Sequence, residues 1–153
     1  MTNKTKIFEE LISDIKKEYT LLANTSAFIY ENFDNLNWAG FYRAENKILY
    51  LDAFQGKVAC TEIPFNRGVC GHAAINQKTI IVDDVHEFAD HIACDSASES
   101  EIVIPLFVKN KLWGVLDIDS PIKKRFDMET KNELEAIAKI LENKLNQLNL
   151  IQK

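Results

Sequence analysis

The three cysteines of this chain are its most reactive side chains, and they lie within one stretch, at Cys60, Cys70 and Cys94. An odd number of cysteines cannot form a framework in which every thiol is paired within one chain. The N-terminal sequence lacks the apolar core of a signal peptide, so we expect a cytoplasmic protein, in which disulfides are usually transient or catalytic. The cysteines therefore predict thiol redox chemistry rather than structural cross-linking.

Zinc binding is one alternative for the cysteines, because His72 and His91 lie near Cys70 and Cys94. The chain has no CxxC or HxxxH pair, and the cysteine spacings of 10 and 24 residues match no common zinc module. An inert, buried thiol is the ordinary alternative for each cysteine taken separately. We expect no metal site.

Two aspartates near the end of a predicted strand form the second reactive group. Side chains alternate between the two faces of a strand, so Trp113, Val115, Asp117 and Asp119 are expected to share one face. Taken alone, this alternation is compatible with a solvated sheet face. Because the same region of the chain carries the cysteines, the aspartates are also candidate acids.

The hairpin that contains this strand decides whether Glu101 joins the aspartates. A three-residue loop at 109–111 would pair Val108 with Leu112 and place Glu101 opposite Asp119. A two-residue loop would turn Glu101 to the other face. Three neighbouring ionised carboxylates repel one another, so we expect a raised pKa or a cationic ligand. Cys94 lies close in sequence to these acids, which suits a reaction in which an acid protonates an oxygen while sulfur attacks sulfur.

An aromatic pair lies on the first predicted strand. Trp38 and Tyr42 are two strand repeats apart, so they share a face, with Gly40 between them. A glycine flanked by aromatic residues can leave room for a ligand against the backbone. The alternative is that both rings simply fill the core.

Composition and charge exclude several classes of partner. The chain has 153 residues and a formal net charge of −5, with no stripe of lysine and arginine. Nucleic acid and anionic membranes are therefore poor partners. No window reaches the roughly 18 apolar residues that a membrane span would need.

The positions of apolar residues predict one α+β domain over 1–153, with N-terminal helices over 1–34, sheet and active-site loops over 37–126, and a C-terminal helix over 127–150. A first helix over 7–22 is expected to end at Asn24, and Asp127 to cap the last helix. The other expected elements are strands over 37–43, 47–54, 79–82, 101–108 and 112–119, a turn at Glu45 and Asn46, and a short helix over 72–76.

Four sequence blocks carry a family resemblance that covers most of the chain from 37 to 126. They are NWAGFY (37–42), FQGKVACTEIPFNRGVCG (54–71), DVHEFADHIACDSASESEIVIPL (84–106) and WGVLDIDS (113–120). Together they resemble the free methionine-(R)-sulfoxide reductases, which are built on a GAF domain. The resemblance implies a central antiparallel sheet of about six strands flanked by N- and C-terminal helices.

The resemblance also implies a role for each candidate residue. The nucleophile falls on Cys94, the resolving or relay cysteines on Cys60 and Cys70 in an order left open, and the substrate-binding residues on Trp38, Tyr42, Glu101, Asp117 and Asp119. It implies thioredoxin as the reductant, no metal or organic cofactor, and an antioxidant role. GAF proteins frequently dimerise through flanking helices, so the amphipathic helices are candidates for a homodimer interface.

The activity that this resemblance implies is reduction of free L-methionine-(R)-S-oxide to methionine. Thiol attack on the sulfoxide sulfur would leave a sulfenic acid, which a second thiol converts to a disulfide. The alternative is a non-catalytic GAF domain that senses a small molecule or redox state.

Overall fold

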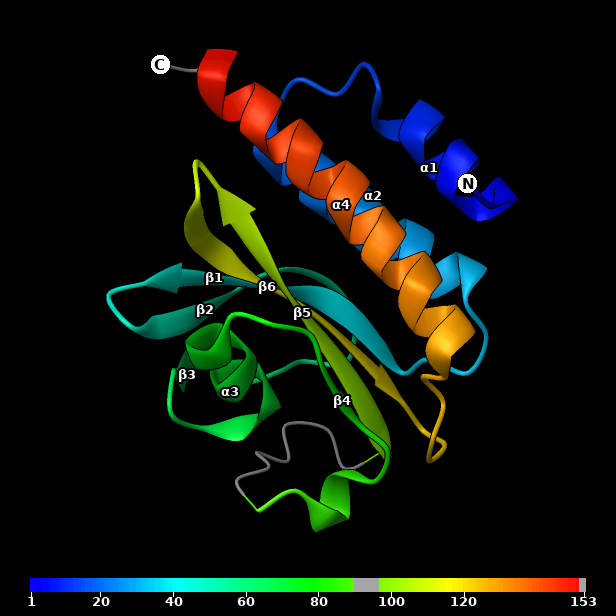
Figure 1. Cartoon of the computed structure of the whole chain (residues 1–153), viewed down its shortest axis with the longest axis vertical. Helices are drawn as coiled ribbons and strands as arrows, with labels where there is room; N and C mark the ends of the chain where they lie inside the picture. Colours follow the sequence, from blue (N-terminus) through cyan, green and yellow to red (C-terminus); the bar gives the residue numbers. More distant parts are fainter. Residues whose placement is uncertain (90–96, 152–153) are drawn as a thin grey trace.

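The computed structural model of the chain describes residues 1–89 and 97–151, and an antiparallel six-stranded sheet forms its centre (Figure 1). The strand order is β3-β2-β1-β6-β5-β4. The strands are β1 (Trp38–Glu45), β2 (Ile48–Gly56), β3 (Glu62–Pro64), β4 (Ile80–Val82), β5 (Ser100–Val108) and β6 (Lys111–Ser120). The helices are α1 (Asn3–Ile12), α2 (Glu18–Asn32), α3 (Gly68–Asn76) and α4 (Met128–Ile151), with a 3-10 turn η1 (Val85–Glu87).

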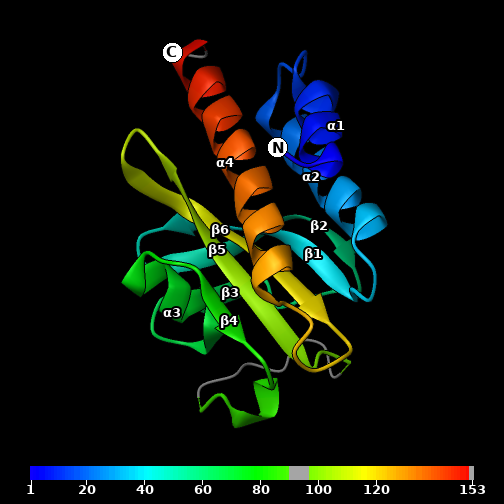
Figure 2. The ribbon, with the colours of Figure 1, turned by 45° about the vertical axis from the view of Figure 1, so that its right-hand side comes forward.

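The two faces of the sheet bury two separate hydrophobic clusters. Helices α1, α2 and α4 cover one face, and α3 lies on the other (Figures 1 and 2). Phe41 and Leu116 point to the three-helix face, whereas their neighbours Tyr42 and Val115 point to the α3 face. This alternation is the two-residue period of a strand, applied to a sheet that is buried on both sides. The predicted α+β class and the antiparallel sheet are confirmed.

The predicted helix over 7–22 is wrong, because the chain breaks earlier than expected. Helix α1 ends at Ile12, and α2 runs without interruption through Thr25 and Ser26. Both hydroxyls donate hydrogen bonds to carbonyl groups four residues earlier within the helix, at 2.7 Å for Thr25 and 2.9 Å for Ser26. At the break, the Ser13 hydroxyl instead bonds the Glu10 carbonyl. Polar residues that favour caps therefore became part of a buried helix interior.

The β5–β6 hairpin has the predicted pairing of Glu101 with Asp119, but its turn and its register differ from the prediction. Its turn has two residues, Lys109 and Asn110, both with positive φ, so the predicted three-residue loop is wrong. The register shifts by one residue beyond Leu106, which pairs with Gly114 and leaves Trp113 as a bulge. This bulge turns Trp113 to the three-helix face, contrary to prediction. The extra residue offsets the shorter turn, so the opposed positions further along the hairpin remain as expected.

The first hairpin differs from prediction by one residue. Its turn consists of Asn46 and Lys47, with φ of 52° and 65°, rather than Glu45 and Asn46. Two left-handed residues in a two-residue turn match the twist of the strands that they connect. The three-residue strand β3, which pairs with residues 48–50, is an addition that the sequence pattern did not reveal.

The last helix begins as predicted. The Asp127 carboxylate accepts a hydrogen bond of 2.8 Å from the Thr130 backbone N–H, which satisfies one of the unpaired donors at the start of α4. We expect Asp127→Ala to lower the free energy of unfolding by about 1 kcal/mol, measured by urea denaturation. Asp127→Asn retains a capping oxygen and is the matched control. Equal losses in the two variants would contradict the capping role.

Helix α4 is amphipathic along its whole length. Its buried stripe contains Leu134, Ile137, Leu141, Leu145 and Leu148, which pack against the sheet and against α1 and α2. No helix within the described parts of the chain combines the length and the apolar character that crossing a membrane requires.

Candidate active site

Strands β5 and β6 bring three carboxyl groups to one place on the α3 face. Glu101 pairs with Asp119 across the hairpin, as predicted, and Asp117 lies between Val103 of β5 and Gly40 of β1. All three carboxyl groups are buried, with at most 9% of each residue exposed. Glu101 forms side-chain hydrogen bonds with both aspartates. The interpretation of a solvated sheet face is therefore wrong, because α3 covers this part of the sheet.

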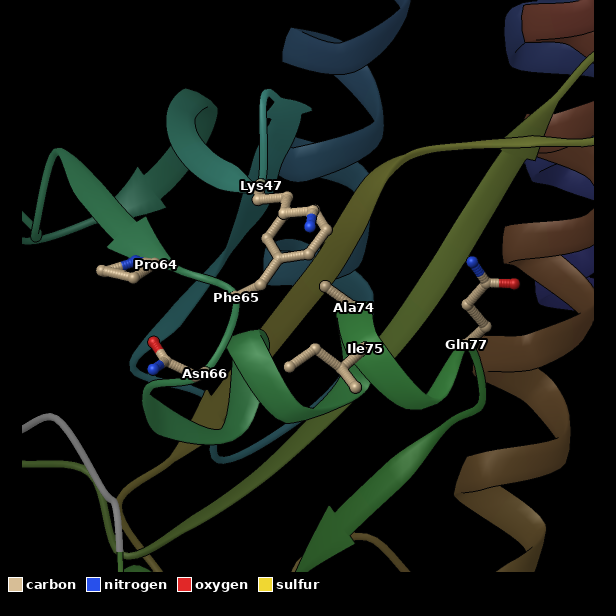
Figure 3. A pocket seen from close by; sticks show the side chains of 7 residues that line it. All are labelled: Lys47, Pro64, Phe65, Asn66, Ala74, Ile75 and Gln77. Carbon is tan, nitrogen blue, oxygen red and sulfur yellow. The ribbon is translucent and has the colours of Figure 1, made fainter.

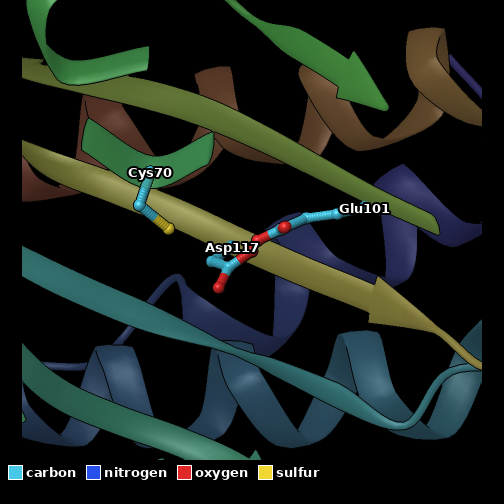
Figure 4. A group of neighbouring side chains, drawn as sticks. All are labelled: Cys70, Glu101 and Asp117. Carbon is cyan, nitrogen blue, oxygen red and sulfur yellow. The ribbon is translucent and has the colours of Figure 1, made fainter. Parts of the chain in front are cut away.

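Helix α3 adds a thiol to the carboxyl group cluster. The predicted helix over 72–76 begins earlier, at Gly68, so Cys70 lies in its first turn. A Cβ atom at Gly71 would lie 2.6 Å from the Phe65 carbonyl oxygen, so only glycine allows this close approach of the helix. The ligand atoms of Cys70, Glu101 and Asp117 lie within 4.8 Å of one another (Figure 4).

Burial governs the protonation of this thiol and its carboxyl neighbours. It raises the pKa of Glu101 well above its usual range, and the nearby Asp117 and Asp119 raise it further. Burial also raises the pKa of Asp117, against the opposing effect of its hydrogen bonds with Glu101 and Cys70. The pKa of the Cys70 thiol is raised by burial and by the same carboxylates. The cluster therefore retains protons that solvent-exposed groups would lose, and Cys70 is a hydrogen-bond donor rather than a thiolate.

One oxygen of the cluster has no hydrogen-bond partner among the described residues. Oδ1 of Asp117 is buried and accepts no hydrogen bond from the described residues. A buried polar atom without a partner usually marks a position that a ligand or water occupies. The donors Cys70, Glu101 and Asp117 are close enough to hold a metal ion, but a metal would have to displace the protons that burial retains. The arrangement is better suited to donating a proton to a bound oxygen.

The raised pKa of Glu101 predicts how stability depends on pH. The unfolded chain ionises Glu101 near pH 4.3, whereas the folded chain keeps the proton to higher pH. Above pH 4.3 the folded state therefore binds more protons than the unfolded state, and this group's contribution to stability is lost as pH rises. Glu101→Gln cannot ionise, so its stability relative to the parent chain should increase with pH, by up to about 1.4 kcal/mol per pH unit.

Urea denaturation of both chains at pH 4.5, 6 and 8 measures this difference. Glu62→Gln, at an exposed position of β3, is the matched control and should show no such trend. A difference between Glu101→Gln and the parent chain that stays constant from pH 4.5 to 8 would contradict the assignment.

The aromatic pair of β1 lies beside the carboxyl groups. Trp38 pairs with Asp119 across the β1–β6 ladder, and its ring stacks on Tyr42 at 5.9 Å and on Phe54 at 5.2 Å. The sequence suggested open space for a ligand at Gly40, and that prediction is wrong. A Cβ at this position would lie 2.3 Å from the Phe54 Cβ. Gly40 therefore accommodates the aromatic stack rather than a ligand against the backbone.

Cys60 and Cys70 lie in the described part of the chain, and they differ in burial and in bonding. Cys60 is half-buried on the β2–β3 connector and is disulfide-bonded, whereas Cys70 is a free thiol. The Tyr42 hydroxyl donates a hydrogen bond of 2.9 Å to the Cys60 carbonyl oxygen. Cys94 and His91 lie outside the described residues. The structure thus brings six of the eight candidate residues to the α3 face, connects Cys60 to them through Tyr42, and leaves Cys94 undescribed.

Sequence reasoning missed three residues next to this cluster. Phe54 stacks on Trp38, and the Asn37 amide donates a hydrogen bond of 3.1 Å to the Ser98 hydroxyl where β1 begins and β5 is about to begin. Strict alternation along β2 would have placed Phe54 on the face opposite Leu51, and a register shift in the β1–β2 pairing brings the two residues into the same cluster. Nothing in the sequence pattern around Asn37 and Ser98 predicted that these two residues would form a hydrogen bond.

A separate hollow of about 490 Å³ lies on the outer side of α3 (Figure 3). Seven described residues line it, and none of them carries a thiol, an imidazole or a carboxyl group. This hollow lacks the acids that the chemistry above requires, so the buried cluster is the candidate active site. Its lining residues are Lys47, Pro64, Phe65, Asn66, Ala74, Ile75 and Gln77.

The fold and this site define a class of protein. Residues 6–145 match the GAF domain family, so the six-stranded sheet with helices on both faces is that of a GAF domain. Several relatives narrow the class further. The chain is 47% identical over 150 residues to the free methionine-R-sulfoxide reductase of Escherichia coli, covering 94% of this chain and 91% of that protein.

Solved structures agree with the sequence comparison. The reduced form of fRMsr of Staphylococcus aureus is 48% identical, with a TM-score of 0.90 over 95% of this chain and 96% of that one. The free methionine-R-sulfoxide reductase of Neisseria meningitidis, in complex with its substrate, is 40% identical, with a TM-score of 0.87 over 97% and 93% of the two chains. The chain therefore belongs to the free methionine-R-sulfoxide reductase family of GAF-domain proteins.

Proposed function

We propose that this chain reduces free L-methionine-(R)-S-oxide to methionine. One observation carries the proposal: a buried carboxyl cluster, in which the pKa values of Glu101 and Asp117 are raised, contains an oxygen, Oδ1 of Asp117, that no described residue satisfies. A sulfoxide oxygen needs hydrogen-bond donors and a proton if its bond to the sulfoxide sulfur is to break. The relatives from Escherichia coli and Neisseria meningitidis bear the name of this activity, which supports the same substrate here.

The substrate would lie between the aromatic rings and the acids. The S-methyl group would contact Trp38 and Tyr42, whose buried rings provide an apolar surface. The sulfoxide oxygen would face Glu101, Asp117 and Asp119, directly or through water. Because the two sulfur epimers place methyl and oxygen differently, such a site accepts one of them.

The chemical step is attack by Cys94 on the sulfoxide sulfur. Glu101 supplies the proton that the sulfoxide oxygen needs, since its pKa is raised well above the ordinary value. The S–O bond of the sulfoxide breaks and the oxygen, now protonated, ends on the Cys94 sulfur. The sulfoxide sulfur gains two electrons and becomes the thioether of methionine, while the Cys94 sulfur loses two and becomes a sulfenic acid. The chain's own residues suffice, without a metal ion or an organic cofactor.

Cys60 is the better candidate for the thiol that resolves the sulfenic acid. It is half-buried and occurs in the disulfide form, whereas Cys70 is buried, free and hydrogen-bonded to Asp117. The Cys70 thiol would then hold the carboxyl cluster in place rather than take part in electron transfer. Thioredoxin would reduce the resulting disulfide, which would make the chain an antioxidant enzyme of the cytoplasm.

A homodimer is part of this proposal. Exposed apolar side chains of α1, Ile7 and Leu11, lie next to the amphipathic helix α4 and would contribute to an interface. Helix α3 lies on the opposite side of the sheet from these helices, so such an interface would not cover the α3 face (Figure 2).

Reaction with racemic free methionine sulfoxide tests the proposed activity. With dithiothreitol as the reductant, consumption should stop at half of the racemate and leave only the S epimer. Consumption of neither epimer would contradict the proposal and favour a GAF domain that only binds a ligand.

A further inference from the structure

The backbone that carries Cys60 is held by the two aromatic residues of the site. The Trp38 indole N–H donates a hydrogen bond of 3.1 Å to the Lys57 carbonyl oxygen. The Tyr42 hydroxyl donates one of 2.9 Å to the Cys60 carbonyl oxygen. Two side chains of β1 thus fix the β2–β3 connector (residues 57–61) at two points three residues apart.

This connector needs such support because it is exposed. Val58, between the two fixed carbonyls, is 87% exposed, and Lys57 is exposed beside it. A hydrogen bond of 3.0 Å from the Leu51 N–H to the Thr61 carbonyl fixes the far end. The position of the Cys60 thiol therefore depends on the rings of β1 as well as on the strand pairing that follows.

We propose that the Tyr42 hydroxyl and the Trp38 indole N–H are positioning groups for the resolving step, which hold Cys60 where it meets the sulfenic acid of Cys94. This inference rests on the proposed function, in which Cys60 resolves that sulfenic acid. The Cys60 sulfur attacks the Cys94 sulfur, the S–S bond forms and the S–O bond breaks. The hydroxyl leaves as water with the proton of the Cys60 thiol, so no outside oxidant is needed.

The chemistry of the two donors suits this role. An indole N–H can only donate, and the Tyr42 hydroxyl remains a donor because burial, with the neighbouring Asp117, raises its pKa. The rings of Trp38 and Tyr42 stack on one another at 5.9 Å, so a change in the position of one ring alters the packing of the other. The same two rings are proposed to contact the methyl group of the substrate, which links release of methionine to the placement of Cys60.

A single-turnover experiment with Tyr42→Phe tests the inference, because phenylalanine retains the ring and removes only the hydroxyl. Reduced protein is mixed with one equivalent of free methionine-R-sulfoxide and quenched at intervals. Methionine is quantified, and mass spectrometry follows the disulfide and the sulfenic acid trapped by dimedone. We expect the ratio of the disulfide rate to the methionine rate to fall about tenfold, which is the size of one lost hydrogen bond.

The controls keep the outcomes separate. Tyr30→Phe, on helix α2, should leave both rates unchanged. Trp38→Phe removes the second donor and should also increase the trapped sulfenic acid, which tests the inference if Tyr42→Phe does not fold. An unchanged ratio in the folded variants, or an equal slowing of both steps, would overturn the inference. Failure of the parent chain to release methionine would instead overturn the proposed function.

Discussion

Cys94→Ser should lose at least about a thousandfold in the release of methionine from free methionine-R-sulfoxide, because it removes the only atom proposed to attack the sulfoxide sulfur. A serine hydroxyl has nearly the same size but a far higher pKa, and it has no oxidation state equivalent to a sulfenic acid. The measurement is methionine formed per chain in the presence of dithiothreitol.

Cys60→Ser separates the attacking thiol from the resolving one. It should still release about one methionine per chain, since the first step needs only Cys94, but it should form no intramolecular disulfide. Near-normal turnover by Cys94→Ser would show that another thiol is the nucleophile, and Cys60 and Cys70 would then be the remaining candidates.

Glu101→Gln is expected to have the second largest effect on activity, a loss of roughly 10²–10⁴-fold in kcat/KM. Glutamine has the shape of the protonated carboxyl group and retains a hydrogen-bond donor, so it should bind the sulfoxide oxygen. It cannot transfer a proton to that oxygen as sulfur attacks. Glu62→Gln, at an exposed position of β3, controls for the change of residue type.

Glu101→Gln also distinguishes a chemical role from a structural one. The raised pKa of Glu101 means that a neutral side chain suits the folded state, so the variant should be more stable than the parent chain at neutral pH. Loss of activity together with gain of stability is the expected pair of results. A variant that loses stability in parallel with activity would contradict the role as an acid.

The sequence predicted which candidate residues share a strand face better than it predicted the geometry that joins the strands. Alternation on two strands was enough to place Trp38 with Tyr42 and Asp117 with Asp119, because strand periodicity is a local property. Glu101 opposite Asp119 was also correct. The loop assumed for that pairing was wrong, and the bulge at Trp113 compensated for it. A bulge depends on packing against Phe41 and the helices, which a local pattern does not encode.

Other features depended on contacts between distant segments. Thr25 and Ser26 are typical of helix ends, yet their hydroxyls donate hydrogen bonds to carbonyl groups within α2. The Ser26 hydroxyl also contacts the Ala53 carbonyl of β2. The pKa values of Glu101 and Asp117 are raised because these groups are buried beneath α3. The sequence pattern does not predict how deeply α3 buries them. The hydrogen bonds from Trp38 and Tyr42 to the connector join side chains to backbone groups 19 and 18 residues away, respectively.

The site departs from the rules that stabilise an ordinary core, and that departure supports its functional reading. Three buried carboxyl groups and a buried thiol replace apolar side chains that would pack at no electrostatic cost. Sites of this kind, where local rules are broken, are usually the ones that carry function.

The most direct test of the central claim is a single turnover that follows substrate and thiols together. Fully reduced protein receives one equivalent of free methionine-R-sulfoxide, or of the S epimer, and the products are analysed by chromatography and by mass spectrometry of peptides. With the R epimer we predict one methionine per chain, a disulfide between Cys60 and Cys94, and an unmodified Cys70. With the S epimer we predict no methionine and three free thiols. Methionine from both epimers alike, or release of methionine without any oxidised cysteine, would contradict the account.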